Sequence, residues 1–159
     1  MQILVRLASP GGRLSRPFQI FLNSCIEAAA DELQRRPLPS LYYICDRQIH
    51  TGTCCCAHIE YQTEPWAGEG VEEFADPYTV FERGWGDCDD LVIFRGAQIR
   101  SVGYPCHARI LHDPVTNKYH TQLTRDFDRV VEDPALQRLQ TKNSFELQRS
   151  RKPWHFPLR

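Results

Sequence analysis

The sequence has no long hydrophobic run and no excess of charge of either sign. Its 159 residues include 19 Lys and Arg against 20 Asp and Glu, which gives a formal net charge of -1. This balance creates no whole-molecule field for nucleic acid, so we expect no nucleic acid as primary ligand. No apolar stretch approaches the roughly 20 residues of a membrane-spanning helix. Arg6 interrupts the first residues too early for a secretory signal peptide. We therefore predict no membrane span and a location in the cytosol or inside a larger particle.

The cysteines lack the spacing of a disulfide framework. There are seven of them, an odd number, and three are contiguous at residues 54–56, which indicates reduced thiols. With Cys45, His50 and His58 nearby, this segment has enough soft ligands for zinc, but it lacks a paired C-x2-C knuckle. A zinc module therefore remains an alternative, and our prediction is a thiol cluster in a loop, with no metal and no cofactor.

The length and the ordinary composition predict one domain at residues 1–135, followed by a tail at residues 136–159. Hydrophobic periodicity and turn residues predict the order of elements within the domain. The expected elements are a strand at 2–8, a helix from Pro17 to Arg36, an ambiguous region at 40–64 with strand-like alternation at 59–62, an exposed acidic loop at 64–76, a short helix that Asp76 caps and Gly84 ends, a buried helix from Asp87 to Gly103, and an antiparallel meander from His107 to Val131.

A thiol lies at the start of the expected buried helix. Residues 84–91 read Gly-Trp-Gly-Asp-Cys-Asp-Asp-Leu, a tight turn that opens a helix with Asp87 as its N-cap and Asp90 as the partner in a capping box. Cys88 then occupies the first turn, where free backbone N–H groups and the positive end of the helix dipole favour thiolate. Asp89 and Asp90 oppose thiolate formation unless they face away from it.

The meander supplies a histidine and a carboxylate for this thiol. If Arg125 lies opposite Asp128 across the second turn, His120 faces Asp133 on one face of the sheet, although a bulge would shift the pairing by one or two positions. Cys88, His120 and Asp133 would then form a thiol acyl-transfer site, with backbone amides at the helix N-terminus available to an oxyanion. The alternatives are a buried structural thiol, a strand-surface histidine and a turn aspartate before Pro134.

These segments resemble the core of the transglutaminase-like superfamily over residues 59–135. The matching residues are 84–91 around Cys88, 99–109, Tyr119-His120 and Glu132-Asp133-Pro134. The resemblance implies an α+β, papain-like fold in which a central helix carrying Cys88 packs on an antiparallel meander. It implies Cys88 as nucleophile, His120 as base and Asp133 as the residue that orients His120. In the family the second oxyanion donor is often an upstream aromatic or amide side chain, for which Trp66, Tyr61 and Gln62 are candidates.

The resemblance implies a thiol hydrolase or acyltransferase that acts on an amide bond of a peptide or a glutamine-like group. Family members include transglutaminases, cysteine proteases, amidases and inactive structural relatives. Small stand-alone members also resemble open reading frames among bacteriophage structural genes. The alternative function is therefore that of a virion protein, a tail or neck component that uses the fold for protein-protein binding.

The predicted tail is basic and aromatic. It carries six Lys and Arg against the single acid Glu146. Trp154 and Phe156 follow Arg151 and Lys152, and aromatic and arginine side chains are common anchors of protein interfaces. We expect this tail to dock on a partner subunit or on a neighbouring copy of the chain.

Overall fold

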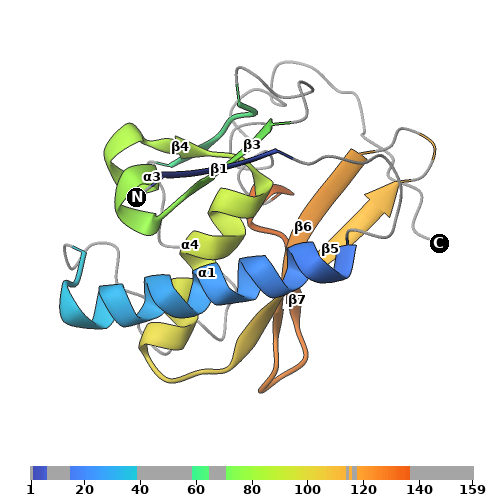
Figure 1. Cartoon of the computed structure of the whole chain (residues 1–159). Coiled ribbons are helices and arrows are strands. Elements are labelled where there is room, and N and C mark those ends of the chain that lie inside the picture. Colours follow the sequence, from blue (N-terminus) through green and yellow to red (C-terminus); the bar gives the residue numbers. More distant parts are fainter. Residues whose placement is uncertain are drawn as a thin grey trace, which may run out of the picture.

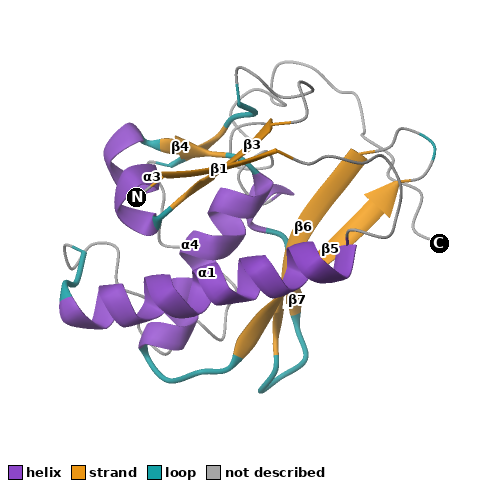
Figure 2. Cartoon of the chain, viewed as in Figure 1, coloured by secondary structure: helices purple, strands orange, loops and turns teal. Residues whose placement is uncertain are grey.

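The computed structural model describes residues 2–6, 15–38, 59–64, 71–113, 115 and 118–136. Within these ranges helices and strands are mixed, and the largest sheet is an antiparallel sheet of three strands (Figures 1 and 2). The element order is β1 (Gln2–Arg6), α1 (Ser15–Arg35), β2 (Glu60–Tyr61), β3 (Val71–Ala75), α3 (Pro77–Arg83), β4 (Trp85–Gly86), α4 (Cys88–Ser101), β5 (Cys106–Asp113), β6 (Lys118–Arg125) and β7 (Val131–Glu132).

Two helices form the centre of the hydrophobic core. Helix α1 buries Leu22, Ile26 and Leu33 at helical spacing, and it crosses α4, which is buried on nearly all sides (Figure 1). The close crossing depends on Gly96 of α4, since a Cβ atom at that position would lie 2.9 Å from Cδ1 of Ile26. Helix α4 ends as predicted, with Gly103 in a left-handed conformation at φ 90°. The element that begins at Cys88 is therefore held at the centre of the fold.

The predicted meander is confirmed as the sheet β5-β6-β7. Both of its strand pairs are antiparallel, and both α1 and α4 contact it. The sheet contributes three fully buried side chains to the hydrophobic core, those of Cys106, Ala108 and Leu123. The sheet thus lies against the helix that carries Cys88.

The predicted register of the second hairpin is wrong by two positions. Leu123 lies opposite Glu132, and the backbone N–H of Arg125 donates to the carbonyl of Val130 at 2.9 Å, so the turn is longer than expected. Arg129 takes a left-handed φ of 59° in this turn, while the predicted partner Asp128 meets Arg125 through side chains, with Nη2 2.6 Å from Oδ2. Because strand side chains alternate with a period of two, this shift keeps the same residues on each face.

Two smaller strand pairs lie near the N-terminal end of α4. Strands β1 and β3 pair antiparallel, and β2 pairs with β4 in parallel, which fits the strand-like alternation at 59–62. The predicted exposed loop at 64–76 is wrong in the part that the structure describes, because residues 71–75 are a strand and Glu64 and Glu73 are buried. Pairing with β1, distant in the sequence, gives this acidic segment its strand conformation.

The short helix α3 follows the prediction from cap to end. The side chain of Asp76 accepts hydrogen bonds from the backbone N–H groups of Tyr78 and Thr79, at 2.9 and 3.0 Å, and Gly84 closes the helix at φ 74°. None of the helices in the described ranges combines the length and apolar character needed to span a bilayer. The thiol-rich segment with its possible zinc ligands, Trp66, and residues 137–159 of the predicted tail lie outside the described residues.

Candidate active site

The turn before α4 places Cys88 at the first position of the helix. Asp87 is its N-cap, as predicted, and Oδ1 of Asp87 accepts hydrogen bonds from the backbone N–H groups of Asp89 and Asp90, at 3.2 and 3.4 Å. Cys88 is half-buried and contacts the hydrophobic core, at the positive end of the helix dipole. The cap thus holds a partly accessible thiol in a fixed position.

The structure brings His120 and Asp133 into contact. Nε2 of His120 lies 2.6 Å from Oδ2 of Asp133, and the amide of Gln122 donates to the same oxygen at 3.2 Å. The other oxygen of Asp133 accepts a hydrogen bond from the backbone N–H of Leu136 at 2.9 Å. If the observed register is continued by one residue, Gln122 lies opposite Asp133, and His120 reaches Asp133 diagonally. The two residues share a face, as the sequence predicted, although not as a directly opposed pair.

His120 is affected electrostatically by both Asp133 and Cys88. Its hydrogen bonds with Asp133 and Cys88 raise its pKa to about 10, against the opposing effect of burial. Burial would raise the pKa of Asp133, but hydrogen bonds from His120 and the Leu136 N–H outweigh it, and that pKa is lowered. Each shift favours a charged group: an imidazolium at His120 and a carboxylate at Asp133.

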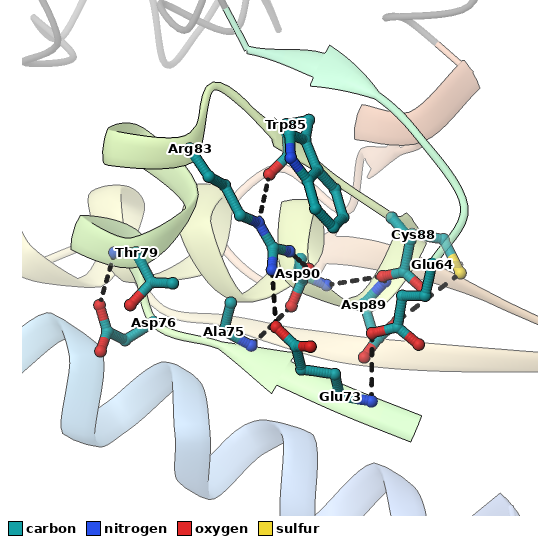
Figure 3. Close-up of polar contacts among 11 residues, drawn as sticks. Glu64, Glu73, Ala75, Asp76, Thr79, Arg83, Trp85, Cys88, Asp89 and Asp90 are labelled. Carbon is teal, nitrogen blue, oxygen red and sulfur yellow. Dashed lines mark hydrogen bonds and ion pairs between the residues drawn. The ribbon is translucent and has the colours of Figure 1, made fainter. Parts of the chain in front are cut away.

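The two aspartates after Cys88 differ in their surroundings (Figure 3). Asp90 points away from the thiol, where its Oδ1 accepts the Ala75 N–H at 2.7 Å and its Oδ2 pairs with Arg83. The predicted capping box through Asp90 is therefore wrong. Asp89 is buried with Oδ1 4.0 Å from Sγ of Cys88, and burial, followed by the nearby Asp87, raises the pKa of Asp89 well above its usual range. A protonated Asp89 would not repel a thiolate.

Arg83 is a residue that the sequence analysis missed. Its guanidinium pairs with Asp90 and, at 2.7 Å, with Oε1 of Glu73 (Figure 3). Its Nε donates a hydrogen bond to the carbonyl of Trp85 at 2.7 Å, and the guanidinium carbon lies 3.8 Å from the centre of the Trp85 ring. The Glu73 N–H in turn donates to Glu64 at 3.1 Å. One arginine thus ties α3, β3 and β4 to the first turn of α4, and no local sequence pattern marks it.

The sequence analysis also missed a second buried network, which includes Glu132, the residue before Asp133. The carboxylate of Glu132 accepts from Arg95 at 2.7 and 3.1 Å, and Oε1 of Glu132 lies 3.0 Å from Nη1 of Arg125. All three side chains are at most 2% exposed. The sequence did hold a signal, because Arg95 interrupts a helix that is predicted to be apolar on most sides, and a buried arginine requires an anionic partner.

The candidate oxyanion donors on β2 and after it differ in their burial. Tyr61 on β2 is half-buried, and its pKa is raised to about 12 by burial and then by the nearby Cys88 and aspartates, so its hydroxyl remains a donor. Gln62 is exposed, and its backbone N–H bonds the carbonyl of Gly86 at 3.1 Å. Trp66 lies outside the described residues. Of the two candidates that the structure describes, Tyr61 is the half-buried one, and Cys88 contributes to its raised pKa.

A cavity of about 690 Å³ opens between α1 and α3, with Cys25, Phe74 and Tyr78 among its lining residues. None of Cys88, His120 and Asp133 lines it, so it is separate from the site at Cys88.

Comparisons of the chain with protein-family models, with curated proteins and with solved structures found no match.

Proposed function

We propose that this chain is a transglutaminase-like thiol hydrolase or acyltransferase that acts on an amide bond through Cys88, His120 and Asp133. The observation that carries the proposal is the 2.6 Å contact of His120 with the Asp133 carboxylate, together with the raised pKa of His120, to which Asp133 and Cys88 contribute. A nucleophile with a base, and a base with an orienting group, are the elements of this chemistry. A papain-like core fits the observed arrangement, in which a helix starting at Cys88 contacts an antiparallel sheet.

In the proposed resting site the proton of the Cys88 thiol has already passed to His120, and Asp133 stabilises the resulting imidazolium. The thiolate attacks the amide carbonyl carbon, and the oxyanion forms at the N-terminus of α4. The N–H groups of Asp89 and Asp90 are bonded to Asp87, so the donor from this turn is the N–H of Cys88, with the Tyr61 hydroxyl as second donor. His120 then protonates the leaving amine. Water or a second amine, deprotonated by His120, attacks the thioester and releases Cys88.

Alkylation kinetics test this proposal without knowledge of the substrate. We expect iodoacetamide to modify Cys88 near neutral pH faster than an ordinary exposed thiol, with the modified residue identified by peptide mass spectrometry. His120→Ala should abolish this excess rate because it removes the proton acceptor.

The matched control is His107→Ala. His107 also pairs with an aspartate, with Nδ1 2.6 Å from Oδ1 of Asp126, but this pair is exposed, and His107 lies opposite Thr124, at the other end of β6 from His120. The His107→Ala variant should alkylate Cys88 at the wild-type rate. An ordinary rate at Cys88 in the wild-type protein, or an equal effect of the two histidine substitutions, would contradict the proposed function.

The alternative function, a bacteriophage structural or assembly protein, stays a prediction. It depends on Trp154, Phe156 and the basic residues around them, which lie outside the described residues. Within the part of the chain that the structure describes, the contacts of Cys88 favour the enzyme.

A further inference from the structure

The carboxylate of Asp133 is oriented by the hydrogen bonds that it accepts. Rotation about the last bond of an aspartate side chain is only weakly restricted, so the carboxylate plane is free to turn unless donors fix both oxygens. The backbone N–H of Leu136 holds Oδ1 at 2.9 Å. Oδ2 receives two contacts from β6, Nε2 of His120 at 2.6 Å and the amide of Gln122 at 3.2 Å. The Asp133 side chain is 15% exposed, so these three donors determine its orientation more than solvent does.

Gln122 is placed closer to Asp133 along the strand pair than His120 is. The two residues are two positions apart on β6 and therefore share a face of the sheet. With the register continued by one residue, Gln122 lies directly opposite Asp133, where Cβ atoms are typically about 4.5–5.5 Å apart, whereas His120 lies on the diagonal at about 7–8 Å. The imidazole can span that diagonal only if Oδ2 is turned toward it. Gln122 donates to this same oxygen from the direct position.

We propose that Gln122 is a positioning residue of the triad, whose amide holds Oδ2 of Asp133 in the orientation that His120 requires. This role rests on the proposed function, because Gln122 acts on Cys88 only through Asp133 and His120. The hydrogen bond with Asp133 is the largest cause of the raised pKa of His120. Burial would raise the pKa of Asp133, but hydrogen bonds from His120, the Leu136 N–H and Gln122 lower it. Gln122 thus begins a chain of interactions that ends at the thiol.

A donor beside this carboxylate can act in two ways, and the two have opposite signs. A donor that only withdraws negative charge from Oδ2 weakens the stabilisation of the imidazolium, so its removal would raise the pH at which His120 titrates. A donor that orients Oδ2 strengthens the contact with His120, so its removal should lower that pH. The direction of the change therefore separates positioning from charge neutralisation. A general loss of stability would produce neither change.

The test compares Gln122→Met with the wild-type full chain. Methionine keeps the length of the glutamine side chain and lacks the amide donor. NMR of the imidazole nitrogens follows the titration, with the His120 signals identified by their absence from His120→Ala. We expect His120 to titrate at a lower pH in Gln122→Met. Near neutral pH, iodoacetamide should alkylate Cys88 about three- to tenfold more slowly, the factor that corresponds to one ordinary hydrogen bond.

Gln122→Glu is a second variant, and its effect should depend on pH. At low pH the neighbouring carboxylate of Asp133 keeps the new carboxyl group protonated, so that it donates in place of the amide. Once ionised, the new group repels Asp133. The alkylation rate of this variant relative to wild type should therefore rise as pH falls, whereas Gln122→Met should show no such recovery. Circular dichroism verifies that both variants fold.

The matched control is Gln34→Met. Gln34 also donates one side-chain hydrogen bond, to the carbonyl of Ser101 at 3.1 Å, at the opposite end of α4 from Cys88. This control should keep the wild-type alkylation rate and the wild-type titration of His120. Three results would each overturn the role of Gln122: an unchanged or higher titration pH of His120 in Gln122→Met, equal alkylation rates of folded Gln122→Met and wild type, or no recovery of Gln122→Glu at low pH.

The proposed function and the role of Gln122 fail on different results. If Cys88 of the wild-type protein alkylates only at an ordinary rate, the proposed function fails, and the role of Gln122 in it falls as well. If wild-type Cys88 alkylates fast, depends on His120, and alkylates equally fast in Gln122→Met, the proposed function stands while the positioning role fails.

Discussion

Replacing Glu132 with glutamine should destabilise the fold strongly, because it removes the carboxylate from a buried network beside the site. Glu132 accepts hydrogen bonds from Arg95 at 2.7 and 3.1 Å and pairs with Arg125 at 3.0 Å, with all three side chains at most 2% exposed. Arg125 retains Asp128 as a partner, at 2.6 Å, but the Arg95 guanidinium loses its carboxylate. Removal of one partner from a buried pair costs about 3–5 kcal/mol. Because domains of this size are stable by only about 5–15 kcal/mol, the loss is a large fraction of the total.

Urea unfolding followed by circular dichroism measures this change, with the free energy of unfolding extrapolated to water. Glu32→Gln is the matched control, since it is the same substitution in an exposed pair with Arg35, at 3.9 Å and 43% and 73% exposed. We expect this control to cost about 0–0.5 kcal/mol. Equal losses in Glu132→Gln and Glu32→Gln would refute the claim that the buried network fastens β7, and with it Asp133, to α4.

Three further changes test separate parts of the fold by the same unfolding measurement. Gly96→Ala should cost about 1–3 kcal/mol, because its Cβ would lie 2.9 Å from Ile26, and Ile26→Val should recover part of the loss by making room; additive effects would contradict this contact. Asp76→Ala removes a cap that accepts two N–H groups and should cost about 0.5–2 kcal/mol, against a few tenths for Asp76→Gly. Burial raises the pKa of Glu64 from 4.5 to about 7, so the folded state binds this proton more tightly than the unfolded state, and stability should fall as pH rises from about 4.5 to 7. Glu64→Gln should reduce that slope, and an unchanged slope would count against a raised pKa.

Local patterns predicted much of the site because its parts are set by short-range chemistry. The caps at Asp76 and Asp87, the ends at Gly84 and Gly103, and the meander all depend on residues within a few positions of one another. Their physical causes, hydrogen bonds to free helix N–H groups and left-handed turns at glycine, need no tertiary context.

Two of the features that were missed depend on contacts between distant segments, and the third depends on a turn. Residues 71–75 carry acidic side chains that suggest a loop, but pairing with β1 makes them a strand. Asp90 has the correct spacing for a capping box, yet Arg83 and the Ala75 N–H hold it elsewhere. The hairpin register followed from the turn, and the left-handed Arg129 lengthened that turn. In the first two cases a tertiary partner outweighed the local preference, whereas the hairpin offset arises within the turn itself.

The offset in the β6-β7 hairpin has a consequence for insertions and deletions. His120 meets Asp133 diagonally, so the pair depends on the register of β6 against β7 and not on the length of the turn itself. An insertion or deletion confined to the turn at residues 126–129 leaves that register and the faces of both side chains unchanged, whereas a slip of the pairing by one residue turns Asp133 to the opposite face. Chains related to this one should accordingly vary in length at residues 126–129, and keep the number of residues between His120 and Arg125 and between Val130 and Asp133.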